Sequence, residues 1–427
     1  MVLTSGGEPP ARLGWLVMVV ACLLAASCGS GSDGAGVAGV KESTTRAGIS
    51  PSTGTSTSPP APTSTATPTT TGSPSSVPVT GTPKTVPCSA GQSLPLTTRQ
   101  KVSQVVLAEL TYAEADQAVR LIRDEGVGGI IFLGSPSSGV GEDLARIRAV
   151  AKGRVGPFLA TDEEGGRVQR LASVLGAIPS AREMAATMTP EQVADLAREH
   201  AKGLRQVGID LDLAPVVDVN ATPTDGGVIG DRSFGTQPAV VAAYGLAFER
   251  GLGEGGVVGT VKHFPGHGRA SGDSHAGPVT TPPLEQLQQV DLLPFEAAAQ
   301  ARVPAMMIGH LTVPGLTNGQ PATFSPEAIK GLLRGQLGYD GLVVTDSVEM
   351  GAITSMGLEP YEVVERTLTA GADLALLPGA IDVGALLDRL AADAGTDKLP
   401  TEDLDRAVRH VAAAKSLVGD WPPASCP

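Results

Sequence analysis

Gly341-Leu342-Val343-Val344-Thr345-Asp346 is a short apolar run that ends on a carboxylate. Similar runs recur along the chain, and several are nearly continuous in Val, Ile, Leu and Ala, as expected of strands buried on both faces of a parallel sheet. We expect eight strands, which are Gln104–Leu110, Val127–Leu133, Pro157–Ala160, Ile209–Leu213, Val257–Val261, Pro304–Ile308, Leu342–Val344 and Asp373–Leu377.

Helical patterns lie between most of these runs. Glu191–Val207 carries apolar side chains at i, i+3, i+4 spacing. Before it, Thr189 is the expected N-cap and Pro190 the first helical residue, with Gln192 closing a capping box. Ser325-Pro326-Glu327 predicts a second helix start of the same kind.

The alternation of strands and helices predicts an α/β fold, a (β/α)8 TIM-type barrel that forms a single catalytic domain. A doubly wound open sheet is the alternative. No Gly-x-Gly-x-x-Gly follows the first strand, which weakens the dinucleotide-binding form of that alternative.

The ends of the chain differ in composition from the predicted barrel. Arg12 precedes an apolar run, Leu13–Ala26, that leads to Ser27-Cys28. This pattern predicts a signal peptide over residues 1–28 with a lipoprotein-like cleavage site, and a plain signal peptide is the alternative. We therefore expect an exported protein that a lipid on Cys28 anchors to the cell membrane, facing the cell wall.

Residues 51–80 contain 24 Ser, Thr or Pro among 30 positions. Such a segment has little to bury, so residues 29–87 are predicted to be a disordered tether, and residues 88–427 the barrel. Cys88 and Cys426 flank the barrel and form a disulfide candidate in an oxidising compartment, with two free thiols as the alternative. The net charge of −13 argues against nucleic acid as a partner. We expect a monomer.

Ionisable residues follow four of the predicted strands. They are Asp162, the Lys262-His263 pair, His310 and Asp346. Active sites of barrels are built at the carboxyl ends of the strands, so these side chains are expected to meet at one mouth.

Three longer motifs contain or adjoin these residues. Asp162–Arg170 fits the pattern D-x-E-G-G-R-V-x-R, Val228–Gly235 fits I-G-D-R-S-F-G, and Lys262–His275 fits K-H-F-P-G-H-G followed by D-S-H. In these motifs the chain resembles glycoside hydrolase family 3, specifically its single-domain NagZ-type β-N-acetylglucosaminidases. The resemblance covers roughly Leu96 to Ala414.

The resemblance implies an exo-acting retaining β-N-acetylglucosaminidase that releases N-acetylglucosamine from the non-reducing end of cell-wall muropeptides, without a cofactor. It implies that Asp346 is the nucleophile, His275 the acid/base and Asp273 its partner. The residues that it implies for sugar binding are Asp162, Arg170, Arg232, Lys262 and His263. One departure concerns specificity: the family pattern D-D-L-x-M is Asp346-Ser347-Val348-Glu349-Met350 in this chain.

The chemistry of these residues fits the implied roles. A retaining glycosidase needs a carboxylate nucleophile and a second group that protonates the leaving oxygen and then deprotonates water. Histidine can perform that exchange near neutral pH, and a neighbouring carboxylate can orient its ring and stabilise its charged form. Glu163, Glu164 and Glu349 are rival acids that rank below Asp346.

Other functions are possible on the same barrel. A metal site could draw on His263, His267, His275 and His310, but Pro265-Gly266 interrupts any helical His pair, so no metal is expected. His267 is then a hydrogen-bonding brace. A β-glycoside phosphorylase and a non-catalytic sugar-binding lipoprotein are the two alternative functions.

Overall fold

Eight parallel strands wind in chain order around one barrel. We describe a computed structural model over residues 96–136, 138–151, 155–224 and 227–419. The strands are β1 (Val106–Thr111), β2 (Gly129–Leu133), β3 (Phe158–Thr161), β6 (Leu211–Asp212), β7 (Val258–Phe264), β9 (Ala305–Ile308), β11 (Leu342–Thr345) and β12 (Ala375–Pro378). Each pairs in parallel with the next along the chain, which confirms all eight predicted strands.

The barrel closes on both sides of β12. This last strand pairs with β1 over Val106–Glu109. On its other side a parallel bridge joins Leu374 to Val344 of β11, and the Thr345 amide donates to the Leu374 carbonyl at 3.0 Å. The strand order never reverses, so the barrel prediction is confirmed and the doubly wound sheet is excluded.

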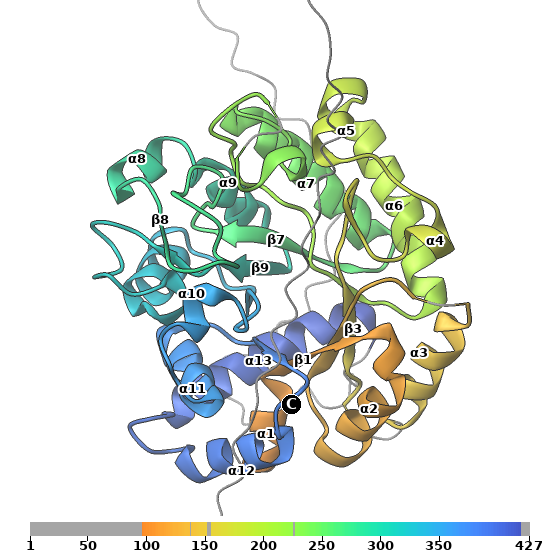
Figure 1. Ribbon diagram of the computed structural model, residues 1–427, viewed down its shortest axis with the longest axis vertical. Helices are drawn as coiled ribbons and strands as arrows, with labels where there is room; N and C mark the ends of the chain where they lie inside the picture. The colour runs from red at the N-terminus through yellow and green to blue at the C-terminus, as the bar shows by residue number, and fades with distance from the viewer. Residues whose placement is uncertain (1–95, 137, 152–154, 225–226, 420–427) are drawn as a thin grey trace, which may run out of the picture. The chain divides into compact units, whose positions relative to one another are not determined.

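Helices surround the strands (Figure 1). They are α1 (Thr98–Gln104), α2 (Ala115–Arg120), α3 (Val140–Ala149), α4 (Ala172–Leu175), α5 (Ala181–Thr187), α6 (Pro190–Val207), α7 (Pro238–Glu254), α8 (Leu284–Gln289), α9 (Leu293–Ala301), α10 (Gly351–Thr354), α11 (Pro360–Ala370), α12 (Val383–Asp393) and α13 (Thr401–Val418). A π-helix, η5 (Glu327–Gln336), fills the position between β9 and β11.

Shorter elements complete the described chain. A π-helical turn, η2 (Leu121–Glu125), extends α2, and single 3₁₀ turns occur at η1 (Tyr112–Glu114), η3 (Gly230–Arg232) and η4 (Ala322–Phe324). Two small strand pairs lie outside the barrel, β4 (Glu163–Gly165) with β5 (Val168–Gln169) and β8 (Val279–Thr280) with β10 (Leu311–Thr312).

The predicted helix starts are confirmed with one difference. The Thr189 side chain accepts from the Gln192 amide, Gln192 closes the capping box, and Pro190 is the first helical residue of α6. Ser325 also caps its helix, since its hydroxyl accepts from the Ala328 amide at 3.2 Å. That helix is π rather than α, a distinction that apolar spacing in the sequence does not make.

Side chains of the strands alternate between two buried layers, as the period of two requires. The inner cluster includes Leu107 of β1, Ala160 of β3 and Val344 of β11. The outer cluster, between strands and helices, includes Ala108 and Val343. Position within this alternation therefore decides which residues can reach the barrel mouth.

Helix α13 packs on the end of the barrel opposite the carboxyl ends of the strands. Its Val411 and Ala414 belong to the inner cluster. Lys415 of the same helix is fully buried, donates to Gln104 Oε1 at 2.7 Å and lies 5.5 Å from the Phe158 ring centroid. Gln104 was expected to begin the first strand and instead ends α1.

Several expectations concern residues outside the described ones. These are the signal peptide, the tether, the lipidated Cys28 and the Cys88–Cys426 disulfide, and they stay predictions. Within the described ranges, no helix is long and apolar enough to cross a bilayer.

Candidate active site

Alternate strands place four charged side chains at the barrel mouth. Glu109 lies on β1 and Lys262 on β7, whereas Asp162 and Asp346 directly follow β3 and β11. Each is an even number of positions beyond a residue of the inner cluster on the same strand, which is Leu107, Val258, Ala160 or Val344. These are the first, third, fifth and seventh strands, and in such barrels alternate strands contribute the side chains of one layer. This layer therefore holds three carboxylates and one ammonium group. Three of the four residues were expected, and Glu109 was not.

Lys262 joins two carboxylates of the site. Its Nζ lies 2.9 Å from Asp162 Oδ1 and 2.7 Å from Glu164 Oε1. Arg232 holds the same Glu164 through both carboxylate oxygens, at 2.7 and 2.8 Å. Although burial alone would raise the pKa of Glu164, these two cations hold it far below its usual range.

Asp162 has a second cation beside it. The Arg170 guanidinium lies 3.6 Å from Asp162 Oδ2. Asp162 is partly exposed, at 14 % of its side chain, and Arg170 at 32 %. The sequence-predicted sugar-binding residues Asp162, Arg170, Arg232 and Lys262 thus form one connected charge network that reaches the surface of the mouth.

A glycine turn places Arg170 relative to this network. Gly165 and Gly166 both have positive φ, at 91° and 57°, and join β4 to β5. A Cβ at Gly165 would lie 2.2 Å from the Pro179 carbonyl, so another residue cannot occupy this turn without displacing the backbone.

His263 is held by a buried carboxylate. Its Nδ1 lies 2.7 Å from Asp218 Oδ2, and its Nε2 lies 3.4 Å from an Arg232 nitrogen. Asp218 also accepts from the His267 amide at 2.6 Å. Burial works against ionised Asp218, but His263 and His267 hold its pKa below the usual value. Asp218 is a positioning residue that sequence reasoning missed, since it lies in a loop between motifs.

Asp346 lies at the carboxyl end of β11 with its charge stabilised. Burial would raise its pKa, but His263, His310 and Lys262 outweigh burial and lower it. The Ser347 amide donates to Asp346 Oδ1 at 2.9 Å. A carboxylate kept ionised in a water-poor site can act as a nucleophile.

Asp273 and His275 form a hydrogen-bonded pair on the rim. His275 Nδ1 lies 2.8 Å from Asp273 Oδ1, and the His275 amide donates to the same oxygen at 3.0 Å. These bonds lower the pKa of Asp273, although burial acts in the opposite direction. The His275 side chain is 70 % exposed, and Nδ1 is the ring nitrogen that contacts Asp273.

The loop that carries this pair is attached to the segment after Asp346. The Gly351 amide donates to the His275 carbonyl at 3.0 Å, and the Ala352 amide donates to the Ser274 carbonyl at 3.1 Å. Ser274 Oγ also lies 2.9 Å from His267 Nε2. The expected role of His267 as a brace is confirmed by this contact.

The three rival acids have other surroundings. Buried Glu163 accepts from the Leu171 amide at 2.6 Å and lies 2.9 Å from His200 Nε2. Glu164 is committed to Lys262 and Arg232, as described above. Glu349 is exposed on the loop beyond Asp346. Neither Glu163 nor Glu164 has the accessible carboxyl that an acid needs.

The histidines of the mouth are bonded to protein groups. His310 Nδ1 lies 2.7 Å from Thr323 Oγ1, and its Nε2 lies 2.9 Å from the Ser347 carbonyl oxygen. Among the described residues, no three His, Cys, Asp or Glu side chains are arranged to hold a metal ion.

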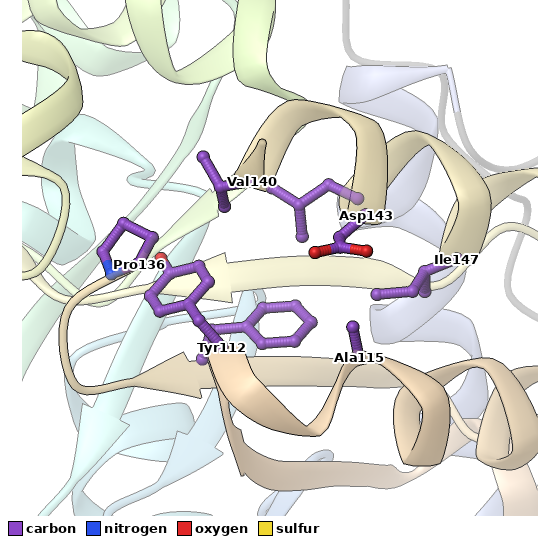
Figure 2. A pocket seen from close by; sticks show the side chains of 8 residues that line it. Tyr112, Ala115, Pro136, Val140, Asp143 and Ile147 are labelled. Atoms are coloured by element: carbon purple, nitrogen blue, oxygen red, sulfur yellow. The ribbon is translucent and has the colours of Figure 1, made fainter. Parts of the chain in front are cut away.

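A small hollow lies outside the charged mouth. Figure 2 shows its lining by Tyr112, Ala115, Val140 and Ile147, with Asp143 at one side. Asp143 accepts from Arg146 at 3.1 Å, and Tyr112 stacks on Phe132, a residue of the outer cluster. The hollow therefore belongs to the packing between strands and helices and adds no group to the site.

One signal in the sequence identifies Glu109. It is the single charged residue in Val105-Val106-Leu107-Ala108-Glu109-Leu110, and it shares the parity of Leu107, which faces inward. Counting alternate positions back from the strand end would have placed it in the mouth.

Comparison with known proteins agrees with this geometry. A family model described as the glycosyl hydrolase family 3 N terminal domain matches residues 97–414. β-Hexosaminidase LpqI of Mycobacterium tuberculosis is 44 % identical over 337 residues, which cover 77 % of this chain and 86 % of that protein.

Solved structures extend the comparison. A family 3 glycosyl hydrolase from Mycobacterium smegmatis superposes with a TM-score of 0.70 at 41 % identity, covering 75 % of this chain and 97 % of that one. A family 3 β-N-acetylglucosaminidase from Paenibacillus gives a TM-score of 0.70 at 36 % identity, covering 76 % and 63 %. With the barrel, the mouth and these matches in agreement, the chain belongs to glycosyl hydrolase family 3.

Proposed function

We propose that this protein is an exo-acting β-N-acetylglucosaminidase that cleaves its substrate with retention of anomeric configuration. The observation that carries the proposal is the Asp346 carboxylate, held ionised at the mouth beside His263, His310 and Lys262. The relatives named β-hexosaminidase and β-N-acetylglucosaminidase support the substrate class.

The first step forms a covalent glycosyl-enzyme. An Asp346 oxygen attacks C1 of the sugar, and the bond from C1 to the leaving oxygen breaks. The leaving oxygen takes the proton from Nε2 of the His275 imidazolium. Asp273, bonded to Nδ1, orients the ring and stabilises its charged form.

The second step regenerates the enzyme. His275 Nε2 takes a proton from water, the water oxygen bonds to C1, and the bond from C1 to Asp346 breaks. Two inversions at C1 give net retention. In this proposal the network of Asp162, Arg170, Arg232, Lys262 and His263 binds the hydroxyl groups of the terminal sugar.

The nucleophile is tested with 4-nitrophenyl N-acetyl-β-glucosaminide. We expect Asp346→Asn to lower turnover on the order of 1,000-fold, which corresponds to about 4 kcal/mol of barrier. Glu349→Gln, on the same loop, is the matched control and should retain most of the activity. If the Asn variant kept more than a tenth of the wild-type rate, another acid would have to be the nucleophile. Proton NMR of the first product should show the β-anomer.

The alternatives have separate tests. A phosphorylase would release product faster with phosphate present and yield a sugar phosphate, whereas a hydrolase is indifferent to it. A non-catalytic binder would turn over none of a set of aryl β-glycosides that vary in the substituent at C2. We propose muropeptides as the natural substrate, tested by release of N-acetylglucosamine from purified muropeptides.

The location is proposed from the sequence of the N-terminus. Lipid on Cys28 would anchor the protein to the cell membrane facing the cell wall. Cys28→Ala should move the protein from the membrane fraction to the medium. If the wild-type protein is itself recovered in the medium, the N-terminus is a plain signal peptide instead.

A further inference from the structure

Glu109 is a charged residue of the mouth that the proposed mechanism does not use. It lies on β1, two positions after Leu107 of the inner cluster, in the layer of Asp162, Lys262 and Asp346. A strand that is otherwise apolar up to this point thus presents one carboxylate to the site. The like charges of Glu349, Asp162 and Asp346 oppose a carboxylate at this position, so it requires a reason.

The contacts of Glu109 lead to the segment after the nucleophile. Ser347 Oγ donates to Glu109 Oε2 at 2.9 Å. Among the described residues, this is the one hydrogen bond of the Glu109 carboxylate. The backbone amide of the same Ser347 donates to Asp346 Oδ1, also at 2.9 Å. Glu109 and Asp346 are therefore linked through a single residue.

Ser347 is also held by His310, which follows the neighbouring strand β9. Its carbonyl oxygen accepts from His310 Nε2 at 2.9 Å. Burial lowers the pKa of His310, and its Nδ1 lies 2.7 Å from Thr323 Oγ1. Ser347 is thus held at its carbonyl by His310, which follows β9, and at its side chain by Glu109 of β1.

The charge on Glu109 is also constrained. Burial is the largest effect on its pKa and raises it, and Glu349, Asp162 and Asp346 raise it further. The Ser347 hydrogen bond acts in the opposite direction. The hydroxyl of Ser347 is therefore the group that stabilises the Glu109 carboxylate in this place.

We propose that Glu109 is a positioning residue which, through Ser347, fixes the Asp346 carboxylate for attack on C1. The inference rests on the proposed function, because it assigns Glu109 a role toward that nucleophile. Glu109 exchanges no proton with substrate and forms no bond to it. Its effect is on the rate of forming the glycosyl-enzyme, since small displacements of a reacting group are costly in rate.

The test is a double-mutant cycle in the full-length protein. The variants are Glu109→Ala, Glu109→Gln, Ser347→Ala and the Glu109→Ala/Ser347→Ala double variant, assayed with 4-nitrophenyl N-acetyl-β-glucosaminide. We expect Glu109→Ala and Ser347→Ala each to lower kcat at least ten-fold, with KM within three-fold of wild type. The double variant should be no slower than the slower single variant, because both remove one contact.

The conservative variant separates positioning from charge. Glutamine keeps an oxygen that accepts from Ser347 Oγ, so Glu109→Gln should restore most of the kcat that Glu109→Ala loses. Glu114→Gln is the matched control, because Glu114 is exposed beside the end of the same strand. It should stay within two-fold of wild type.

Three outcomes would overturn the proposal. The first is a double variant in which the losses of kcat from the two single variants multiply, as they do for independent residues. A second is a change confined to KM, which would make Glu109 a sugar-binding group. The third is a Gln variant as slow as the Ala variant. If Glu109→Ala does not fold, as judged by circular dichroism, Ser347→Ala and Glu109→Gln decide by the same criteria.

Asp346→Asn in the same assay separates this inference from the proposed function. If Asp346→Asn loses activity and the Glu109 and Ser347 variants do not, the inference alone is wrong. If Asp346→Asn remains active, the nucleophile itself is wrongly assigned and Glu109 has no such role.

Discussion

At the scale of single residues, opposite environments act on carboxylates that lie in one mouth. Asp346 has its pKa lowered because cationic neighbours outweigh burial, whereas Glu109 has its pKa raised because burial dominates. The difference follows from which side chains each strand places beside the acid. Two acids at equivalent strand positions therefore differ in the property that decides whether an acid can be a nucleophile.

The exposed pair of Asp273 and His275 predicts a dependence on leaving group. His275→Ala should slow poor leaving groups, such as alkyl glycosides, far more than activated aryl ones, because only poor leaving groups need a proton on departure. Asp273→Ala should act in the same direction, but more weakly. The measurement is a plot of log kcat/KM against the pKa of the leaving group.

Azide provides the control for this prediction. Breakdown of the glycosyl-enzyme still needs a base for water, so the His275→Ala enzyme should accumulate the intermediate, and azide should accelerate its turnover. Equal slowing of all leaving groups, without an effect of azide, would make His275 a binding or structural group.

The histidines of the mouth predict insensitivity to chelators. His263, His267 and His310 are each within hydrogen-bond distance of a named protein partner, and His275 is bonded to Asp273. We expect the rate after prolonged EDTA treatment and gel filtration to equal that of untreated enzyme. Loss of activity that Zn²⁺ restores would instead indicate metal-assisted hydrolysis.

At the scale of elements, the sequence predicts the existence of strands better than the residues at which they begin and end. Buried strands such as β11 are continuous apolar runs, so their existence could be predicted from composition alone. Their ends could not, because Gln104 is polar and buried in α1 through a contact with Lys415, which is 311 positions away. Long-range partners of this kind have no local signal.

The same limit applies to the site. Asp162, Lys262 and Asp346 follow apolar runs and were found by that rule, whereas Glu109 lies inside β1 and was missed. The role of Asp218 can be recognised only in the folded barrel, where β6 and β7 lie side by side. There His263 Nδ1 lies 2.7 Å from Asp218 Oδ2. Charged residues at strand ends could be predicted from the sequence. Contacts between residues of different loops could not, because they form only when the barrel closes.

The start of α10 predicts a steric requirement for activity. A Cβ on Gly351 would lie 2.8 Å from the His275 carbonyl oxygen and 2.7 Å from the Ala276 carbonyl carbon. Gly351→Ala should therefore displace the loop of His275 and lower turnover of alkyl glycosides at least ten-fold, with a smaller effect on activated aryl substrates.

Gly253→Ala is the matched control for this change. Gly253 lies in α7, and a Cβ there meets nothing within 4 Å. That variant should keep wild-type kinetics. Unchanged kinetics of Gly351→Ala would mean that the loop holds His275 without the close approach to α10.

At the scale of the whole molecule, the two ends of the barrel have different tasks. Charged side chains at the mouth form the proposed active site, whereas those at the opposite end stabilise the closure of the barrel. Asp373 is fully buried where the chain enters β12, and its Oδ2 accepts from the Val343 amide at 2.8 Å and from Arg334 at 2.6 Å. His410 Nδ1 lies 2.9 Å from Asp373 Oδ1 but out of hydrogen-bond alignment, so this contact is a charge pair.

Asp373 therefore predicts how the stability of the barrel depends on pH. Burial opposes its ionisation, but Arg334, His410 and Arg406 hold its pKa below the usual value. Because the folded pKa is lower than the unfolded one, its contribution to stability is complete above about pH 4 and is lost as the pH falls through the folded value. Asp373→Asn should lower the free energy of unfolding at pH 7 by roughly 3–5 kcal/mol, since it leaves buried cations without their partner.

The measurement is urea unfolding of wild type, Asp373→Asn and a matched control at several pH values. Asp340→Asn is the control, because its carboxylate lies 3.4 Å from the same His410 but is 97 % exposed. A pair exposed to this degree adds little, so Asp340→Asn should unfold close to wild type. The gap between wild type and Asp373→Asn should be largest near pH 5 and should shrink below pH 4. Although burial lowers the pKa of His410, Asp373 outweighs burial and raises it, so the pair is fully charged near pH 5. A constant gap down to pH 2, or equal losses for the two variants, would show that barrel closure does not depend on the charge of Asp373.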